Sequence, residues 1–187
     1  MHTLYIIAGC NGAGKTTASK FLLPEVFYTN IFINADIIAA EINPDHPELA
    51  AMKAGRMMLQ QIQQRLAAKE TFAIETTLAT RTYLNLVKQA QLLDYEVRLI
   101  FYYLPSTEMA IERVKLRVSK GGHHIPADVI ERRYILGIRY FFEYIKMVDR
   151  WHIYENHQTP PVKIAEGQRD KFENIINFDL WEKLKHI

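Results

Sequence analysis

One short segment near the N-terminus carries the clearest chemical pattern in the chain. Residues 9–16 read Gly-Cys-Asn-Gly-Ala-Gly-Lys-Thr and fit G-x-x-x-x-G-K-[S/T] completely. The glycines let backbone N–H groups converge on phosphate oxygens, and the helix expected after them adds the positive end of its dipole. The lysine then contacts the β- and γ-phosphates, and the hydroxyl binds Mg²⁺. We therefore expect a bound nucleoside triphosphate, with Thr16 as the magnesium ligand. The residues expected to hold the nucleotide are Gly9, Asn11, Gly12, Ala13, Gly14, Lys15, Thr16 and Thr17.

Two carboxylates follow predicted strands that would end beside this loop. Asp36 comes after Phe32-Ile33-Asn34, and Glu75 comes after Phe72-Ala73-Ile74. Because the carboxyl ends of parallel strands open onto one crevice, both acids should face the phosphates. A kinase needs a carboxylate there to orient an acceptor hydroxyl and take its proton. We assign that role to Asp36, which can also cap the following helix. Glu75 is expected to bind either acceptor hydroxyls or a magnesium-bound water.

Arginines flank a second glycine-containing loop. Arg113 and Arg117 stand four residues apart, on one face of a predicted helix. A Gly-Gly-His-His-Ile-Pro loop follows, and Arg132 and Arg133 lie on the next predicted helix. Two such helices resemble the lid of small kinases, here over about 113–133, where guanidinium charge stabilises the transferring phosphoryl group. We expect Arg113 and Arg117 on the nucleotide and Arg117, Arg133 and Lys15 in catalysis. The plainer alternative is a solvated helical hairpin.

This chain lacks the further sequence signatures of several classes of P-loop protein. The Asn-Lys-x-Asp motif that reads guanine is absent, and so is the Ser-Gly-Gly-Gln signature of ABC-type ATPases. The absent guanine motif favours ATP over GTP. The long apolar strand expected over 97–104 ends in Pro105 rather than in the usual Walker-B aspartate. Cys10 occupies a free position of the phosphate loop, and we interpret it as a small filler rather than a nucleophile.

Predicted strands and helices alternate along the chain. Strands are expected at 4–8, 31–34, 71–74, 95–104, 151–154 and 162–165. Helices are expected at 15–23, 36–42, about 49–69, 82–93, 108–119, 127–147 and from Asp170 onward. This alternation predicts an α/β fold of the P-loop NTPase class, with a mainly parallel sheet, helices on both faces and a kinase-like helical lid. We see no linker, so one domain is expected over 1–187.

Composition narrows the possible partners and location. The 187 residues are 49% hydrophobic and 24% charged, as in ordinary globular domains. The net charge of +2 gives no overall attraction to acidic membranes or nucleic acid, so neither is expected as a partner. Cys10 is the single cysteine and cannot form an internal disulfide, which favours a reducing compartment. With no apolar run of about 18–20 residues, a cytoplasmic location is expected.

Beyond the phosphate loop, three segments resemble the zeta-toxin family of P-loop kinases and its bacterial ATPase relatives. They are Asn34-Ala35-Asp36, Glu75-Thr76-Thr77-Leu78 and residues 113–134, and the resemblance covers most of 3–156. In zeta toxins the counterpart of Asp36 activates a hydroxyl of UDP-N-acetylglucosamine. The resemblance further implies magnesium on Thr16. It also implies phosphate contacts from Lys15 and Arg117, and sugar-nucleotide contacts from Glu75 and Thr77.

Two positions depart from that family. Zeta toxins have arginine two residues after the matching threonine, where this chain has Ala79 and then Arg81 two residues later. We expect Arg81 to contact the substrate. A second lid arginine is replaced by His123, which leaves Arg132 or Arg133 to substitute. ATP-dependent phosphotransfer is therefore better supported than UDP-N-acetylglucosamine as acceptor, and better supported than toxicity.

The leading hypothesis is a kinase that moves the γ-phosphoryl group of Mg·ATP to a hydroxyl of a small molecule, with a nucleotide sugar as one candidate. An antitoxin-like inhibitor protein is a candidate partner. The alternative is an ATP-binding switch that acts through a protein partner. A kinase of nucleic-acid ends is a third reading, motivated only by the local arginines and opposed by the near-neutral charge balance.

Overall fold

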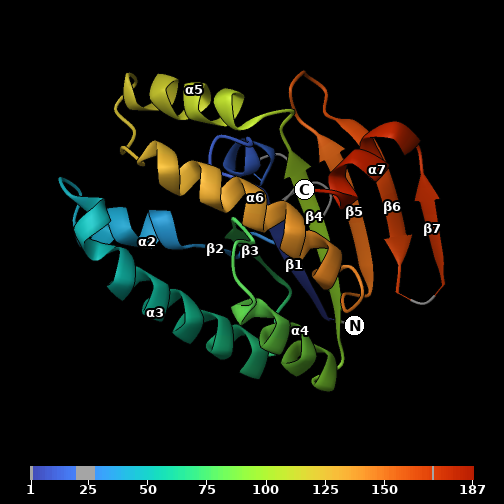
Figure 1. Ribbon diagram of the computed structural model, residues 1–187. Coiled ribbons are helices and arrows are strands. Elements are labelled where there is room, and N and C mark those ends of the chain that lie inside the picture. The colour runs from blue at the N-terminus through green and yellow to red at the C-terminus, as the bar shows by residue number, and fades with distance from the viewer. Residues whose placement is uncertain (1, 20–27, 170) are drawn as a thin grey trace.

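The computed structural model describes residues 2–19, 28–169 and 171–187, and its centre is a twisted sheet (Figure 1). In the described residues the sheet has seven strands, in the order β2-β3-β1-β4-β5-β6-β7. The strands are β1 (His2–Ala8), β2 (Phe32–Asn34), β3 (Phe72–Thr76), β4 (Tyr95–Tyr103), β5 (Arg150–Glu155), β6 (Val162–Gln168) and β7 (Phe172–Ile175). The strands from β2 to β5 pair in parallel, and β6 and β7 extend the sheet antiparallel. The predicted mainly parallel sheet is confirmed.

The parallel part of the sheet is covered on both faces. Every residue of β1 after His2 is buried, although successive side chains point to opposite faces of a strand. Continuous apolar runs such as Leu4–Ala8 are typical of parallel strands that lie between two layers of helices. The pairing register places Ile7 and Asn34 on either side of Glu75. The carboxyl ends of β1, β2 and β3 therefore meet at one edge of the sheet.

The helices follow the predicted order. They are α2 (Ala35–Ile42), α3 (Pro47–Ala67), α4 (Thr82–Leu92), α5 (Thr107–Val118), α6 (Ala127–Tyr144) and α7 (Phe178–Lys185). A helix also starts at Lys15, as expected, and runs through residue 19; the rest of the predicted 15–23 helix lies outside the described residues. Ser106 caps α5 by accepting a hydrogen bond from the Met109 N–H. In Figure 1, α5 and α6 lie side by side and form the predicted helix–loop–helix.

The C-terminal prediction was wrong in part. A helix was expected from Asp170 onward, but β7 comes first and pairs with β6, and α7 begins only at Phe178. Residues Phe172–Ile175 form a strand because β6 offers them backbone hydrogen-bond partners, and a pattern of neighbouring residues in the sequence does not reveal such partners. On α3, Leu49 and Met52 are exposed, whereas Ala50, Ala54 and Met58 face the core.

The antiparallel end of the sheet is closed by an aromatic cluster. The rings of Trp151 on β5 and Trp181 on α7 stack with centroids 5.4 Å apart and an interplanar angle of 4°. Phe141 of α6 meets both rings edge-on. Both tryptophans are 1% exposed, so the cluster fastens α7 to the sheet. Among the described helices, none is long and apolar enough to cross a membrane.

Candidate active site

The phosphate loop leaves β1 at the carboxyl edge of the sheet and is tightly packed against other elements. Gly12 has a φ of +81°, which side chains rarely adopt, and a Cβ there would lie 2.8 Å from the Ala110 carbonyl oxygen of α5. A Cβ on Gly9 would lie 2.3 Å from the Tyr102 carbonyl oxygen of β4. Gly9 and Gly12 therefore need to be glycine for two reasons. Their φ angles are positive, and a neighbouring backbone carbonyl leaves no room for a Cβ.

Lys15 and Thr16 both contact Glu75. The Lys15 Nζ donates to the Cys10 carbonyl at 3.0 Å and lies 3.7 Å from Glu75 Oε1. The Thr16 hydroxyl donates to Glu75 Oε2 at 2.8 Å. Because Glu75 is largely buried, its charge is balanced by Lys15 rather than by solvent. Burial raises the pKa of the Cys10 thiol to about 11, so the thiol stays protonated near neutral pH, as a filler residue should.

These oxygen donors fit a magnesium ion. Mg²⁺ takes oxygen ligands, keeps several waters and is completed by substrate phosphates, so one hydroxyl and one carboxylate from the protein are sufficient. The Thr16 hydroxyl and the Glu75 carboxylate supply this pair at the mouth of the phosphate loop. In the described part of the chain, no group of three His, Cys, Asp or Glu side chains could hold a metal by itself.

Asp36 opens α2 opposite the phosphate loop. The Asn34 side chain caps this helix by accepting from the Asp36 N–H at 2.7 Å, so the Asp36 carboxylate does not serve as the cap. Arg133 of α6 donates to the Asn11 side-chain oxygen at 3.1 Å. Burial lowers the pKa of Arg133, and the nearby negative charge of Asp36 opposes that fall. The Asp36 carboxylate and the Arg133 guanidinium are therefore neighbours directly beside the phosphate loop.

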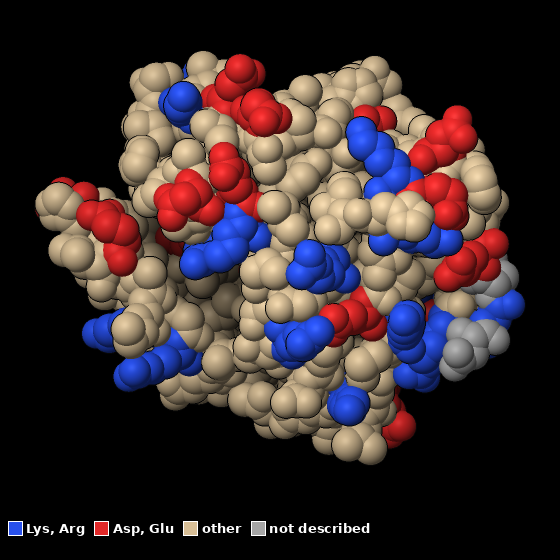
Figure 2. All heavy atoms as spheres, viewed as in Figure 1, with Lys and Arg blue, Asp and Glu red and all other residues tan. Residues whose placement is uncertain are grey.

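A pocket of about 220 Å³ joins these groups, and we call it the P-loop pocket. It is lined by Asn11, Lys15, Asn34, Ala35, Asp36, Met58, Glu75, Thr76, Thr77, Thr80, Tyr83 and Arg133. The structure thus brings together six of the predicted site residues, namely Asn11, Lys15, Asp36, Glu75, Thr77 and Arg133. Figure 2 shows the surface hollowed between α6 and α3, with acidic and basic side chains near the rim of the recess.

A second pocket, the lid pocket, lies on the other side of Asp36 and Arg133. It has a volume of about 260 Å³, shares both residues with the P-loop pocket and reaches the loop between α5 and α6 through His123 and His124. Most of its other lining is apolar, including Ile125. A group that entered from the lid side would therefore meet Asp36 before it reached the phosphate loop.

Arg113 is held beside the phosphate loop by residues that sequence reasoning missed. Its guanidinium donates to the backbone carbonyls of Asn156 at 2.8 Å and His157 at 3.1 Å. The Asn156 side chain donates in turn to the Ala13 carbonyl at 2.7 Å. Asn156 directly follows β5, so the rule that polar residues at the carboxyl ends of parallel strands line the crevice would have identified it.

Arg117 and Arg81 stand away from the P-loop pocket. Arg117 donates to the His123 carbonyl at 3.4 Å and lines neither pocket. Arg81 forms two hydrogen bonds with the Glu143 carboxylate of α6, at 2.6 and 2.8 Å. The Arg81 guanidinium also lies 5.0 Å from the ring centroid of Tyr140. The structure therefore does not bring these two predicted residues to Asp36.

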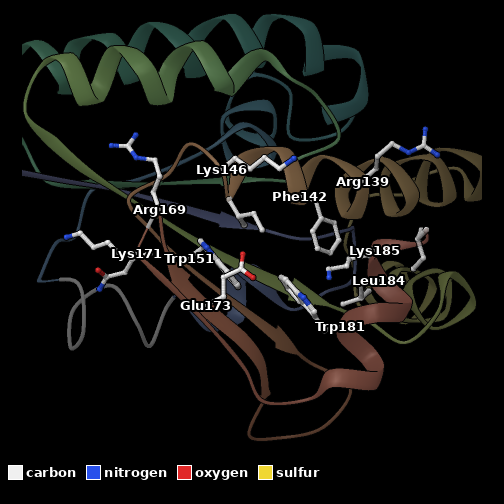
Figure 3. Close-up of a pocket in the computed structure, with 13 residues that line it drawn as sticks. Arg139, Phe142, Lys146, Trp151, Arg169, Lys171, Glu173, Trp181, Leu184 and Lys185 are labelled. Carbon is white, nitrogen blue, oxygen red and sulfur yellow. The ribbon is translucent and has the colours of Figure 1, made fainter.

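A larger cavity of about 790 Å³ lies at the other end of the molecule (Figure 3). Trp151, Trp181 and Phe142 line it between α6, α7 and the antiparallel strands, and Glu173 extends toward Trp151. Basic side chains including Arg139 and Lys171 extend outward around it. It contains none of the residues of the phosphate loop, so its volume does not make it the active site.

Comparisons with solved structures agree with the fold. The chain aligns with the ATP-containing crystal structure of AvrRxo1-ORF1:-ORF2 at a TM-score of 0.76, with 13% identity over 99% of this chain and 64% of the other. It aligns with a structure of the PezAT chromosomal toxin–antitoxin system of Streptococcus pneumoniae at a TM-score of 0.68, with 20% identity over 97% of this chain and 78% of the other. The chain therefore spans about two thirds of the AvrRxo1 chain, and the shared feature is a P-loop kinase-like fold.

Sequence comparison identifies the family. An uncharacterized protein of Haemophilus influenzae (strain ATCC 51907 / DSM 11121 / KW20 / Rd) is 33% identical over 126 residues, which are 67% of this chain and 88% of that protein. Residues 4–134 match the sequence model of the AAA domain family. This match includes the phosphate loop, Asp36, Glu75 and Arg133, and it ends before the antiparallel strands. The chain is therefore a member of the AAA domain family of P-loop proteins.

Proposed function

We propose that the chain is an ATP-dependent kinase, zeta-toxin-like in its site, that transfers the γ-phosphoryl group of Mg·ATP to a hydroxyl of a small molecule. The observation that carries this proposal is the P-loop pocket, in which Asp36, Glu75 and Arg133 meet Lys15. A site that only bound Mg·ATP could hold its metal with Glu75 and would need no second carboxylate such as Asp36. A phosphotransferase needs one to orient the acceptor hydroxyl.

The proposed reaction has a distinct role for each residue. Backbone N–H groups of 12–17 and the Lys15 ammonium hold the phosphates. Thr16 and Glu75 would hold Mg²⁺, which would supply charge neutralisation on the phosphate oxygens. The acceptor oxygen bonds to the γ-phosphorus, the bond to the β–γ bridging oxygen breaks, and ADP leaves. Asp36 accepts the proton that the acceptor hydroxyl loses.

The lid arginines are proposed to act at different points of this reaction. Arg133 already lies in the P-loop pocket, so its charge can stabilise the developing negative charge on the transferring group. Arg113 is anchored beside the phosphate loop and would contact the nucleotide. Arg117 would reach the phosphates only if the loop between α5 and α6 moved, because it now contacts the His123 carbonyl.

An inhibitor protein is proposed as a second partner. The support is the fold shared with a chain of the AvrRxo1-ORF1:-ORF2 structure and with a chain of the PezAT toxin–antitoxin system. Co-expression with the product of a neighbouring small gene should yield a stable complex with lower ATP turnover. Two proteins that purify separately, with unchanged turnover, would remove this partner.

The test of the proposed function is transfer of label. Purified protein, Mg²⁺ and γ-labelled ATP are incubated with a small-molecule extract. We expect label on a small molecule and an equal amount of ADP, and we expect Lys15→Ala to abolish both. Slow ATP hydrolysis without a labelled product, together with ATP-dependent retention of a protein, would contradict the kinase. That result would support the alternative of an ATP-binding switch.

A further inference from the structure

We propose that the acceptor is a small polyhydroxy compound that carries no phosphate or carboxylate. This inference rests on the proposed function and names the substrate class of the same site. It comes from the part of the P-loop pocket that is lined by residues outside the phosphate loop, which we call the hydroxyl wall. This wall consists of Thr76, Thr77, Thr80, Tyr83 and Met58.

The polar groups of this wall are neutral hydroxyls. The Thr76 hydroxyl oxygen accepts from the Leu78 N–H at 3.0 Å, and the Tyr83 hydroxyl lies 3.7 Å from the Met58 sulfur. A hydroxyl can donate once and accept twice, so each of these groups keeps hydrogen-bonding capacity after its present contact. Burial raises the pKa of Tyr83, which keeps its phenol protonated. Several neutral donor–acceptor groups on one wall suit the hydroxyls of a polyol.

The charges of the pocket oppose an anionic acceptor. Its lining carries two acidic side chains, Asp36 and Glu75, and two positively charged side chains, Lys15 and Arg133. Both positive charges lie toward the phosphate loop, where Lys15 contacts Glu75 and Arg133 contacts Asn11. A bound triphosphate would add negative charge at that end. An acceptor with its own phosphate would then meet charges of like sign at short range, without a cation to compensate them.

The arginine best placed in sequence to neutralise an acceptor phosphate is already engaged. Arg81 directly follows Thr80 of the hydroxyl wall in sequence, but both of its hydrogen bonds go to Glu143. The position two residues after Thr77 holds Ala79, which has no charge. Among the described residues that line the pocket, no arginine or lysine other than Lys15 and Arg133 is present. The described lining of the pocket therefore offers no free positive side chain to bind the diphosphate of a nucleoside diphosphate sugar.

The size of the pocket points the same way. Pockets for drug-sized ligands are about 300–1,000 Å³, and the P-loop pocket is smaller, at about 220 Å³. Part of that space adjoins Lys15 and belongs to the γ-phosphate. The Met58 thioether and the Tyr83 ring offer apolar surface for the C–H face of a compact polyol. An acceptor of monosaccharide size, neutral or amine-bearing, fits these limits.

Fractionation of a metabolite extract tests this inference. The extract is passed over an anion exchanger, and each fraction is incubated with the protein, Mg²⁺ and γ-labelled ATP. We expect acceptor activity in the unretained fraction, and we expect phosphatase treatment of that fraction to leave it unchanged. A cation exchanger then separates neutral from amine-bearing acceptors. Acceptor activity that is confined to the retained fraction, or lost on phosphatase treatment, would overturn the inference while leaving the kinase intact. Failure of every fraction would reject both.

Two variants locate the acceptor on the hydroxyl wall. Tyr83→Phe and Thr77→Val should each raise the KM for the active fraction about fivefold, which corresponds to one net hydrogen bond, with the KM for ATP unchanged. Tyr140→Phe is the matched control, because the Tyr140 ring, rather than its hydroxyl, contacts Arg81 outside the pocket. If both variants kept the acceptor KM of the unmodified protein, the acceptor would not lie on this wall.

Discussion

At the scale of single residues, Glu75 contacts both groups that a magnesium nucleotide would engage. Its two oxygens meet the Thr16 hydroxyl and the Lys15 ammonium. Glu75→Gln keeps the size but removes the charge, so the Mg²⁺ concentration for half-maximal turnover should rise about 10–100-fold. A magnesium titration at fixed ATP measures this. Glu70→Gln, which weakens an ion pair with Arg65 and does not touch the P-loop pocket, should leave the titration unchanged. Equal curves for all three proteins would remove Glu75 from the magnesium site.

Arg133 and Arg132 are adjacent in sequence but differ in environment. Arg133 lines the P-loop pocket and contacts Asn11, whereas Arg132 is exposed. If Arg133 stabilises the transferring phosphoryl group, Arg133→Ala should lower kcat about 10²–10³-fold. Arg132→Ala should stay within about twofold. Acceptor-dependent turnover measures both, with thermal melting as a check on folding. The reverse ranking would transfer the role to Arg132.

The placement of a candidate site residue beside the phosphate loop could be predicted from the sequence where that residue follows a strand. Asp36 and Glu75 could be selected because the ends of parallel strands converge at one edge. The contacts of Arg133 with Asn11 and of Asn156 with Ala13 could not be predicted in this way. They join residues that are 122 and 143 positions apart in the sequence. Such pairs form only when α6 and the end of β5 pack against the phosphate loop. Arg81 was expected at the substrate for its position near Thr77, but Glu143 from a distant helix binds it.

At the scale of elements, two helical glycines meet opposite surroundings. A Cβ on Gly137 of α6 would lie 2.7 Å from the Thr77 carbonyl oxygen, whereas a Cβ on Gly55 of α3 would meet nothing within 4 Å. Gly137→Ala should therefore lower the free energy of unfolding by about 1–3 kcal/mol. Gly55→Ala should raise it by about 0.5–1 kcal/mol, because alanine favours the helix. Denaturant unfolding of both variants checks the pair, and equal shifts would contradict this packing of α6.

Element types were predictable because apolar periodicity and caps are local. The predicted alternation of strands and helices is confirmed, and Ser106 supplies such a local cap for α5. The C-terminal segment differs because short stretches such as Phe172–Ile175 take their structure from the strand beside them. On α3, Ala50 and Ala54 are buried together with Met58, because close helix packing favours small side chains there.

At the scale of the whole molecule, the antiparallel end depends on one aromatic stack. Trp181 packs on Trp151 and joins α7 to β5. Trp181→Ala should lower the free energy of unfolding by about 3–5 kcal/mol, because it empties a fully buried site. Phe178→Ala on the same helix, where the ring is 64% exposed, should change it by less than about 0.5 kcal/mol. Denaturant titrations compare the two. Equal losses would show that α7 is not held by the stack.

The central claim is that Asp36 accepts the proton of an acceptor hydroxyl beside a γ-phosphate bound in the phosphate loop. The most direct measurement compares acceptor-dependent turnover and ATP affinity for Asp36→Asn, with the exposed Asp45→Asn as control. The amide keeps the size of the carboxylate but cannot take the proton. We predict that Asp36→Asn lowers kcat about 10²–10⁴-fold with ATP affinity within about twofold, and that Asp45→Asn changes neither. An unchanged kcat in Asp36→Asn would contradict the mechanism.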